Sequence, residues 1–318
     1  MDARLHRRTV TIDDLDAVVA LLAASDIAVL GRTDYTADEV ATDLRDEDIH
    51  HEGWYDDTGA LVAYGWVMRS GESSKVVVDA YVAQDAEPST GPDLIAHLEG
   101  RAAALAKAAG HDHAVLDIGA YRQDERSAGW LRARGFMVGT TFTRMRIDLD
   151  PAQPVLQKPL PDGVTLRRND GSEPELRIGH QLIEDAFTEH YGHVAETFEH
   201  YRKRFEEHGE GWSTLYLAEL DGEPVAELIG TRQFEPDDDC GYVRSIGVVR
   251  AGRGRGIAKA MLRRYFADCH EQGRAGVLLH VDVSNVTNAL GVYESVGMRP
   301  VLEIDAWAKT VEATTVEA

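Results

Sequence analysis

The segment with the clearest chemical potential is an arginine- and glycine-rich loop at residues 250–256, which reads RAGRGRG. It follows an apolar strand predicted at 243–249 and precedes a helix predicted to begin near Ile257. Gly254 and Gly256 allow the backbone to approach an anion closely, and the first N–H groups of a helix are unpaired donors at the positive end of its dipole. Three arginines add charged donors: Arg250, Arg253 and Arg255. The pattern predicts a phosphate-binding loop.

Two other nucleotide-binding loops and an ordinary turn are the alternatives for this segment. A Walker P-loop has Lys and then Ser or Thr after its last glycine, whereas the nearest lysine, Lys259, lies inside the predicted helix and precedes Ala260. A Rossmann loop requires GxGxxG, but Gly252, Gly254 and Gly256 are spaced GxGxG. A solvated turn does not require three arginines interleaved with three glycines. The residues therefore favour an anion cradle of another class.

Composition limits the partners and the compartment. The chain has 318 residues, 43% of them hydrophobic and 28% charged, which is typical of a globular protein with room for two domains. A formal net charge of −22 argues against nucleic-acid binding and would steer cationic molecules such as amines toward the surface. The longest apolar run near the N-terminus, residues 17–24, is too short to span a membrane. Cys240 and Cys269 fit a reducing compartment, so we expect a cytoplasmic protein.

The predicted elements follow the same order in both halves of the chain, which indicates an internal repeat of an α/β (α+β) fold. TGALVA at 58–63 matches DGEPVA at 221–226, and WLRARGF at 130–136 matches VYESVGM at 292–298. A stretch with four prolines separates the halves. The expected organisation is a first domain, a linker and a second domain: residues 1–150, 151–161 and 162–318.

The order of elements in the second half, together with two motifs, resembles the GCN5-related N-acetyltransferase (GNAT) family. The acyl-CoA loop of that family is written Q/RxxGxG/A, and a later motif is YxxxGF/M. The matching residues are Arg253, Gly256 and Ala258 in the loop, and Tyr293, Gly297 and Met298 in the later motif. The resemblance covers the second half fully and the first half as a weakened copy. It implies two tandem GNAT domains, each with a mixed central sheet flanked by helices.

The resemblance also implies that acetyl-CoA is the cosubstrate and that several residues bind it. In the family, the strand before the loop diverges from the following strand and pairs with the pantetheine arm through its backbone. The residues implied for this role are Ile246, Gly247, Val248 and Val249. The pyrophosphate would lie on N–H groups of Arg253, Gly254, Arg255, Gly256, Ile257 and Ala258. Asn285 would bond to the CoA arm or, equally, cap the following helix.

The implied reaction is transfer of an acetyl group to the primary amine of a small molecule, such as an antibiotic, an aminosugar or a thiol metabolite. Tyr293 occupies the position of the general acid that protonates the departing thiolate, and an N–H near Val248 would stabilise the oxyanion. Glu227 and Asp239 are the candidates for the general base. The alternative is a surface carboxylate for Glu227 and a solvated turn for Asp239. We interpret His280 as a core histidine.

The first half lacks the chemistry of the second. Its segment at 85–92 has no arginine, contains Glu87 and has prolines that remove backbone donors, and Leu131 occupies the position that matches Tyr293. We therefore expect a GNAT-like domain that does not bind acyl-CoA. No set of residues has metal-ligand spacing, so no metal is expected. The alternative function is a non-catalytic acyl-CoA-binding or sensing protein, and the chain is expected to be a monomer or a homodimer.

Overall fold

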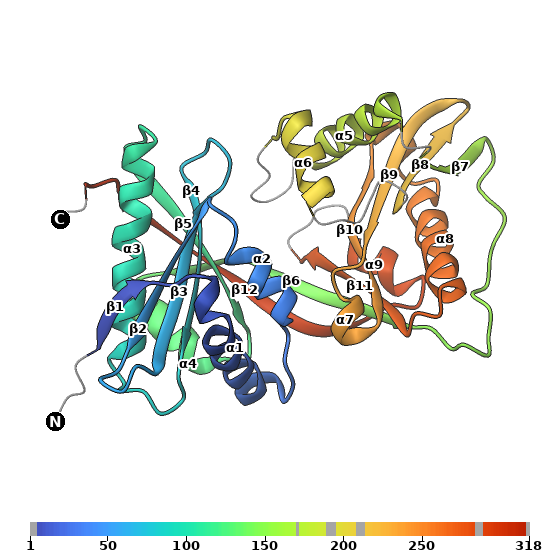
Figure 1. The fold of residues 1–318 in the computed structure, drawn as a ribbon. Helices are drawn as coiled ribbons and strands as arrows, with labels where there is room; N and C mark the ends of the chain where they lie inside the picture. The colour runs from blue at the N-terminus through green and yellow to red at the C-terminus, as the bar shows by residue number, and fades with distance from the viewer. Residues whose placement is uncertain (1–4, 170–171, 189–194, 208–213, 284–288, 316–318) are drawn as a thin grey trace. The chain divides into compact units, whose positions relative to one another are not determined.

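A computed structural model describes residues 5–169, 172–188, 195–207, 214–283 and 289–315 (Figure 1). The chain forms two compact units. The first contains Met1–Thr141 and Ile304–Ala318, and the second contains Phe142–Glu303. Both are mixed α/β units, which confirms the predicted fold class. None of the helices in the described ranges combines the length and the apolar character needed to cross a bilayer.

The first unit contains a mostly antiparallel sheet in the order β1-β2-β3-β4-β5, in which only β4 and β5 pair in parallel. Its elements are β1 (His6–Thr9), a 3-10 turn (Ile12–Asp14), α1 (Leu15–Leu30), α2 (Ala37–Asp43), β2 (Ile49–Tyr55), β3 (Leu61–Arg69), β4 (Lys75–Val82), α3 (Thr90–Ala108), β5 (His113–Tyr121) and α4 (Glu125–Ala133). Alternate residues of β3 enter two apolar clusters, since Ala63 packs with α3 and α4 whereas Tyr64 packs with α1 and α2. The helices therefore cover both faces of the sheet.

The second unit repeats this plan with the order β11-β10-β9-β8-β7, in which β10 and β11 are parallel. Its elements are β7 (Val164–Arg168), α5 (Glu173–Phe187), α6 (Phe198–Glu207), β8 (Leu215–Leu220), β9 (Glu223–Thr231), α7 (Glu235–Asp238), β10 (Cys240–Val248), a 3-10 turn (Arg250–Gly252), α8 (Ile257–Glu271), β11 (Gly276–Asp282) and α9 (Ala289–Glu294). Leu228 of β9 packs with α8, and its neighbour Ile229 packs with α5 and α6.

Local sequence explains the hairpin that carries β9. Asp221 and Gly222 join β8 to β9, and both have positive φ, 52° and 88°. A two-residue turn with positive φ at both positions matches the twist of the flanking strands, and Asp-Gly is among the sequences that favour it. The predicted hairpin therefore fixes the register in which Glu227 lies opposite Leu217 of β8.

The last strand of each half lies in the unit formed mainly by the other half. The strand β6 (Met137–Asp148) pairs with β11 of the second unit from Phe142 to Asp148, and β12 (Arg299–Glu312) pairs with β5 of the first unit from Ile304 to Glu312. The boundary between the units is therefore not the proline-rich stretch. Residues 142–150 belong to the second unit, and residues 304–318 belong to the first. Pairing between strands so distant in the sequence leaves no local pattern.

The two parallel strands of the second unit separate before they end. The pairing of β10 with β11 stops at Val243 and Leu279, whereas β10 continues to Val248 along β9. The strand has a β-bulge between Val243 and Ser245, where the separation begins. This is the divergence predicted for the strand before the glycine-rich loop.

The exchanged strand predicts an effect on stability. Trp307 of β12 is 5% exposed and belongs to the core cluster of the first unit, whereas Val301 of the same strand is 38% exposed. We expect Trp307→Ala to lower the free energy of unfolding by about 3–5 kcal/mol because it empties part of that core. Val301→Ala is the matched control and should change it by less than about 1 kcal/mol. Equal urea midpoints for the two variants would contradict the assignment.

Candidate active site

The glycine-rich loop of the second unit has the geometry of an anion cradle. Gly254 and Gly256 have φ of 77° and 80°, in the left-handed region that favours glycine, and Gly256 is the N-cap of α8. The first helical N–H bond runs from Ala260 to the Gly256 carbonyl. The N–H groups of Ile257 and Ala258 therefore have no acceptor within the helix. They can hold the oxygens of a pyrophosphate group.

Arg253 has a role that the sequence did not reveal. Its Nε donates to the carbonyl of Val248 (3.0 Å) and its Nη2 to that of Ala186 (3.5 Å), so its side chain ties the loop to β10 and α5. Its backbone N–H donates to the Arg250 carbonyl at 3.3 Å. This N–H was predicted to bind the pyrophosphate, but it is used within the 3-10 turn instead. The side chain of Arg255 is exposed.

The exposed edge of β10 offers backbone groups on the side from which β11 has diverged. The Val249 N–H donates to the Val225 carbonyl beside β9 (2.9 Å). Because successive residues of a strand direct their N–H and C=O groups to opposite sides, Gly247 also faces β9, and Ile246 and Val248 face the gap. Two of the four residues predicted to pair with an extended arm are therefore oriented to do so.

Glu227 is the buried carboxyl group of this region. Its side chain has no solvent exposure, and this burial raises its pKa from 4.5 to about 8. Hydrogen bonds from Ser245 and from the Gly247 backbone favour the charged form and partly oppose this rise. Ser245 Oγ donates to Glu227 Oε1 at 2.8 Å. Among the described residues, none forms a hydrogen bond to Oε2. The alternative of a surface carboxylate is therefore wrong.

Gly247 leaves the room that this carboxyl group occupies. A Cβ at Gly247 would lie 2.8 Å from the Cβ of Ala186 and 3.0 Å from Glu227 Oε1. Side chains do not pack at these distances, so any other residue would displace α5 or the carboxyl group. Gly247 was predicted only for backbone pairing, and Ser245 was not predicted. The available signal was a serine beside Ile246 on a largely apolar strand.

Tyr293 of α9 packs in the same core cluster as Ala226 and Leu228, the neighbours of Glu227 on β9. The phenol is 9% exposed, and its pKa is raised to about 12 by burial first, and then by the negative charges of Glu227 and Tyr242. At neutral pH Tyr293 is therefore a proton donor. A carboxyl group with a pKa of about 8 is mostly protonated at neutral pH and becomes a proton acceptor as the pH rises toward 8. The second unit thus combines a glycine-rich loop with free helical N–H groups, a buried carboxyl group and a buried phenol.

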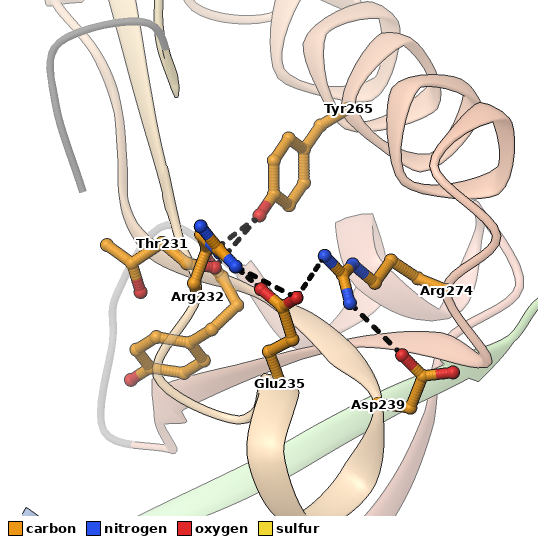
Figure 2. A network of polar contacts seen from close by, with 7 residues as sticks. Thr231, Arg232, Glu235, Asp239, Tyr265 and Arg274 are labelled. Atoms are coloured by element: carbon orange, nitrogen blue, oxygen red, sulfur yellow. Dashed lines mark hydrogen bonds and ion pairs between the residues drawn. The ribbon is translucent and has the colours of Figure 1, made fainter. Parts of the chain in front are cut away.

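Asp239 lies in a different part of the second unit (Figure 2). It precedes β10 with φ of 48°, its side chain is 57% exposed, and its Oδ1 accepts from Arg274 Nη1 at 3.2 Å. Arg274 also binds Glu235, which Arg232 Nη2 contacts at 3.0 Å, so the cluster clamps the turn of α7. Along β10, Asp239 is roughly 25 Å from Gly247 beside Glu227. The structure therefore separates it from Glu227 and Tyr293.

Two further expectations concern ligands of other kinds. Asn285 lies outside the described residues. Within the described ranges, His, Cys, Asp and Glu side chains form no group of three or more that could hold a metal ion.

The corresponding region of the first unit is filled by its own side chains. Arg126 of α4 donates to the carbonyls of Val82 (3.3 Å) and Ala83 (2.9 Å) at the end of β4. A Cβ at Gly91 would lie 2.2 Å from the ring of Trp130, so this ring lies directly against the start of α3. The cavity that remains, between α1, β4 and α4, has a volume of about 250 Å³.

The acid and the base are also replaced in the first unit. Extending the repeat alignment by one residue pairs Tyr64 with Glu227, and Tyr64 forms a hydrogen bond with His51 Nδ1 (2.8 Å). Leu131, which pairs with Tyr293, is 1% exposed in the core.

Comparison with known proteins agrees with this geometry. Residues 179–298 match the model of the acetyltransferase (GNAT) family. Most of the second unit is therefore similar to the acetyltransferases of the GNAT family. It is also similar to a curated relative named mycothiol acetyltransferase from Beutenbergia cavernae, with 29% identity over 90% of this chain and 95% of that one. These matches support an acetyltransferase activity that uses acetyl-CoA.

Solved structures extend the likeness to the whole tandem fold. A GCN5-related N-acetyltransferase from Sphaerobacter thermophilus has a TM-score of 0.81 at 22% identity, covering 99% of this chain and 98% of that one. A tandem GNAT protein from the clavulanic acid biosynthesis pathway has a TM-score of 0.73 at 15% identity, covering 99% and 100%. At these identities the likeness concerns the fold alone. The predicted tandem GNAT architecture is confirmed.

The buried Glu227 predicts how stability changes with pH. Its pKa is raised from 4.5 to about 8, so in this window the folded chain retains a proton that the unfolded chain has released. Its contribution to stability is complete below about pH 4.5 and is lost as the pH rises toward 8, at about 1.4 kcal/mol per pH unit. In Glu227→Gln this decline should disappear. Urea unfolding at several pH values measures it, and an unchanged slope in the variant would show that Glu227 is ionised when folded.

Proposed function

We propose that this chain transfers the acetyl group of acetyl-CoA to the primary amine of a small molecule, with the chemistry in the second unit. The observation that carries this proposal is the burial of two proton-transfer groups in the second unit. These are the Glu227 carboxyl, with a pKa of about 8, and the Tyr293 phenol, which packs in the same core cluster as the neighbours of Glu227 on β9. A non-catalytic acyl-CoA-binding protein does not require both groups to be buried at a cost in stability.

Binding of acetyl-CoA is assigned to the loop and to the free edge of β10. The pyrophosphate would be held by N–H groups at the start of α8, with Gly254 and Gly256 admitting it to the backbone, and Arg255 would add charge. Ile246 and Val248 would pair with the pantetheine arm. Arg253 would hold the loop in place through the Val248 carbonyl.

In the proposed reaction Glu227 is the general base and Tyr293 the general acid. Glu227 accepts a proton from the bound ammonium ion, directly or through a water molecule, which frees the nitrogen lone pair for attack on the thioester carbon. The C–N bond forms, the C–S bond breaks, and Tyr293 supplies the proton that converts the leaving thiolate to a thiol. The nitrogen is positively charged after the attack and releases a second proton, which restores Tyr293 directly or through water. The proton on Glu227 returns to solvent. The Val248 N–H faces the side where charge develops on the carbonyl oxygen.

The acceptor is proposed to be a thiol metabolite, an aminosugar or an antibiotic that carries a primary amine. The first of these is supported by the relative named mycothiol acetyltransferase. The net charge of −22 would attract a cationic amine over distances of about one Debye length. The first unit is proposed to have no catalytic role, since its tyrosine and leucine replace the base and the acid.

The proposal predicts release of free thiol from acetyl-CoA in the presence of a panel of small primary amines. Glu227→Gln and Tyr293→Phe should each lower kcat/KM by roughly 100-fold or more, because each removes a proton-transfer group. The conservative variant Asp239→Asn is the control and should leave the rate within about twofold, since Asp239 is exposed and distant. In the wild type kcat/KM should rise with pH up to about 8, where Glu227 becomes ionised. Acetyl-CoA binding without turnover on the whole panel would instead favour the non-catalytic alternative.

The proposal also predicts that one chain binds one molecule of acetyl-CoA in calorimetry. Gly256→Val should weaken binding at least tenfold, since a β-branched residue resists φ of 80° and its side chain would cover the cradle. The matched control is Gly110→Val, which has a similar φ of 83° in open space in the first unit. Two equivalents bound would contradict the role assigned to the first unit, and equal weakening by both variants would contradict the cradle.

A further inference from the structure

The proline-rich linker, residues 151–161, runs beside α8 and reaches the glycine-rich loop (Figure 1). Gln157 donates from Nε2 to the carbonyl of Arg263, at the end of the second turn of α8, at 2.9 Å. Four residues later, Cγ of Pro161 lies 3.9 Å from the position of a Cβ on Gly256, the N-cap of α8. Residues 158–160 are therefore held beside the first two turns of this helix.

The spacing of these two anchor points matches an extended linker. Along the axis of a helix, the step from Gly256 to Arg263 measures roughly 11 Å. The step from Gln157 to Pro161 measures roughly 12 Å in the polyproline conformation, which prolines adopt and which they favour in the residue before them. Val155 adds a third anchor, since it packs against the core cluster of the second unit. The linker therefore runs antiparallel to the start of α8.

Cations without a carboxylate partner gather on this part of the second unit. The segment 250–264 contains six arginines and lysines and no acidic residue. Arg264 forms an ion pair with Asp268 (3.1 Å), and Arg253 donates to two backbone carbonyls. Within the described part of the chain, the remaining cations of the segment and the one lysine of the linker have no side-chain hydrogen bond or ion pair: Arg250, Arg255, Lys259, Arg263 and Lys158.

Three of these cations lie along the same two turns of α8. Lys259 and Arg263 are four residues apart, so they share a face of the helix. Lys158 lies beside the same turns, because the preceding residue, Gln157, is bonded to the Arg263 carbonyl. The chain has 55 acidic and 33 basic residues, yet none of its described carboxylates pairs with these three side chains. Such a patch keeps a positive potential on a negative protein, which favours a polyanionic ligand.

The linker also exposes apolar side chains beside its lysine. Leu156 and Leu160, two residues to either side of Lys158, are 75% and 42% exposed. Apolar surface next to a group of cations is complementary to a ligand that joins an aromatic ring to a phosphate group.

Acetyl-CoA carries both groups at the end away from its thioester, where an adenosine bears a 3′-phosphate. The pyrophosphate is assigned to the start of α8 and the pantetheine arm to β10. The adenosine would therefore leave the pyrophosphate in the other direction. Pro161 borders the loop at Gly256, so the linker and the adjoining face of α8 are surfaces available to it.

We infer that the linker and the first two turns of α8 bind the adenosine 3′-phosphate of acetyl-CoA. Lys158, Lys259 and Arg263 would bind the 3′-phosphate, and Leu160 would pack against the adenine ring. The stretch that connects the two repeats is then also part of the cosubstrate site. This inference rests on the proposed function, since it concerns the cosubstrate of that same site.

The test compares, by calorimetry, CoA with 3′-dephospho-CoA, which lacks only the 3′-phosphate. The wild type should bind CoA about tenfold more tightly at low salt, and this ratio should shrink at about 0.5 M salt because exposed charges are screened. Lys158→Met should lower the affinity for CoA about threefold or more and leave that for 3′-dephospho-CoA within about twofold. In the triple variant Lys158→Met, Lys259→Met and Arg263→Met, the ratio should fall toward one.

Lys107→Met is the matched control. Lys107 is an exposed lysine in the last turn of α3, and its side chain has no partner among the described residues. Its loss changes the net charge as much as Lys158→Met does, but it should leave the ratio of the two affinities unchanged. Binding of 3′-dephospho-CoA also shows in each variant that the loop is intact.

Three results would overturn the inference. These are equal affinities of the wild type for the two ligands, an equal loss for both ligands in Lys158→Met, and the same change of the ratio in Lys107→Met. Each of them leaves acetyl transfer in the second unit possible. If the wild type binds neither ligand, the proposed function fails and the inference fails with it.

A second experiment locates the contact directly. After brief treatment with an acetimidate reagent, mass spectrometry measures how far each lysine has been modified. Saturating CoA should protect Lys158 and Lys259, whereas Lys107 should react equally with and without the ligand. Protection of neither Lys158 nor Lys259 would place the 3′-phosphate elsewhere and contradict the inference.

Discussion

The separation of β10 from β11 is the constraint on which the functional part of the second unit depends. Backbone groups that lose their sheet partner away from water must find another one. Arg253 lies in the glycine-rich loop and donates a hydrogen bond to the Val248 carbonyl. The other backbone groups on this side of β10 line the gap between the two strands. In the first unit, Arg126 reaches the carbonyls at the end of β4 from α4, and its side chain occupies this space. One requirement of the backbone is thus met in two ways, and only one of them leaves room for a ligand.

Burial of Glu227 is the energetic counterpart of that open gap. A carboxyl group without solvent exposure and with one oxygen unbonded among the described residues is unfavourable for folding. The surrounding residues limit this cost, since Ser245 satisfies one oxygen and Gly247 leaves space for the group. The same desolvation raises the pKa toward the working pH of a base. Strain of this kind concentrates at functional sites and is balanced by the rest of the unit.

The repeated order of elements and the glycine-rich loop before α8 could be predicted from the sequence, because each depends on local patterns such as periodicity, glycine spacing and turn residues. Tyr293 was predicted from a family motif, and its role remains a prediction. The buried state of Glu227 could not, since it depends on how α5 and Gly247 close over the strand. Asp239 and Glu227 both carry a carboxyl group, so residue type alone does not show which of them is buried. The pairing of β9 with β10 does, because it places Glu227 opposite Gly247 and leaves Asp239 before the start of β10. The side-chain interactions of Arg253 and the hydrogen bond from Arg144 of β6 to His280 of β11 are likewise tertiary. Arg144 lies in the first half of the sequence but in the second unit, and no local signal predicts this.

The exchange of strands has a consequence for how the protein is made. The first unit contains almost all of the residues synthesised first, yet β5 obtains its neighbour only when residues 304–312 have been synthesised. Until then the backbone groups along one side of β5 are unpaired, and such an edge can pair with another chain. Domains often fold in order from the N-terminus during synthesis. Here the first unit is completed last, so nascent chains pass through a long interval in which they need protection from aggregation.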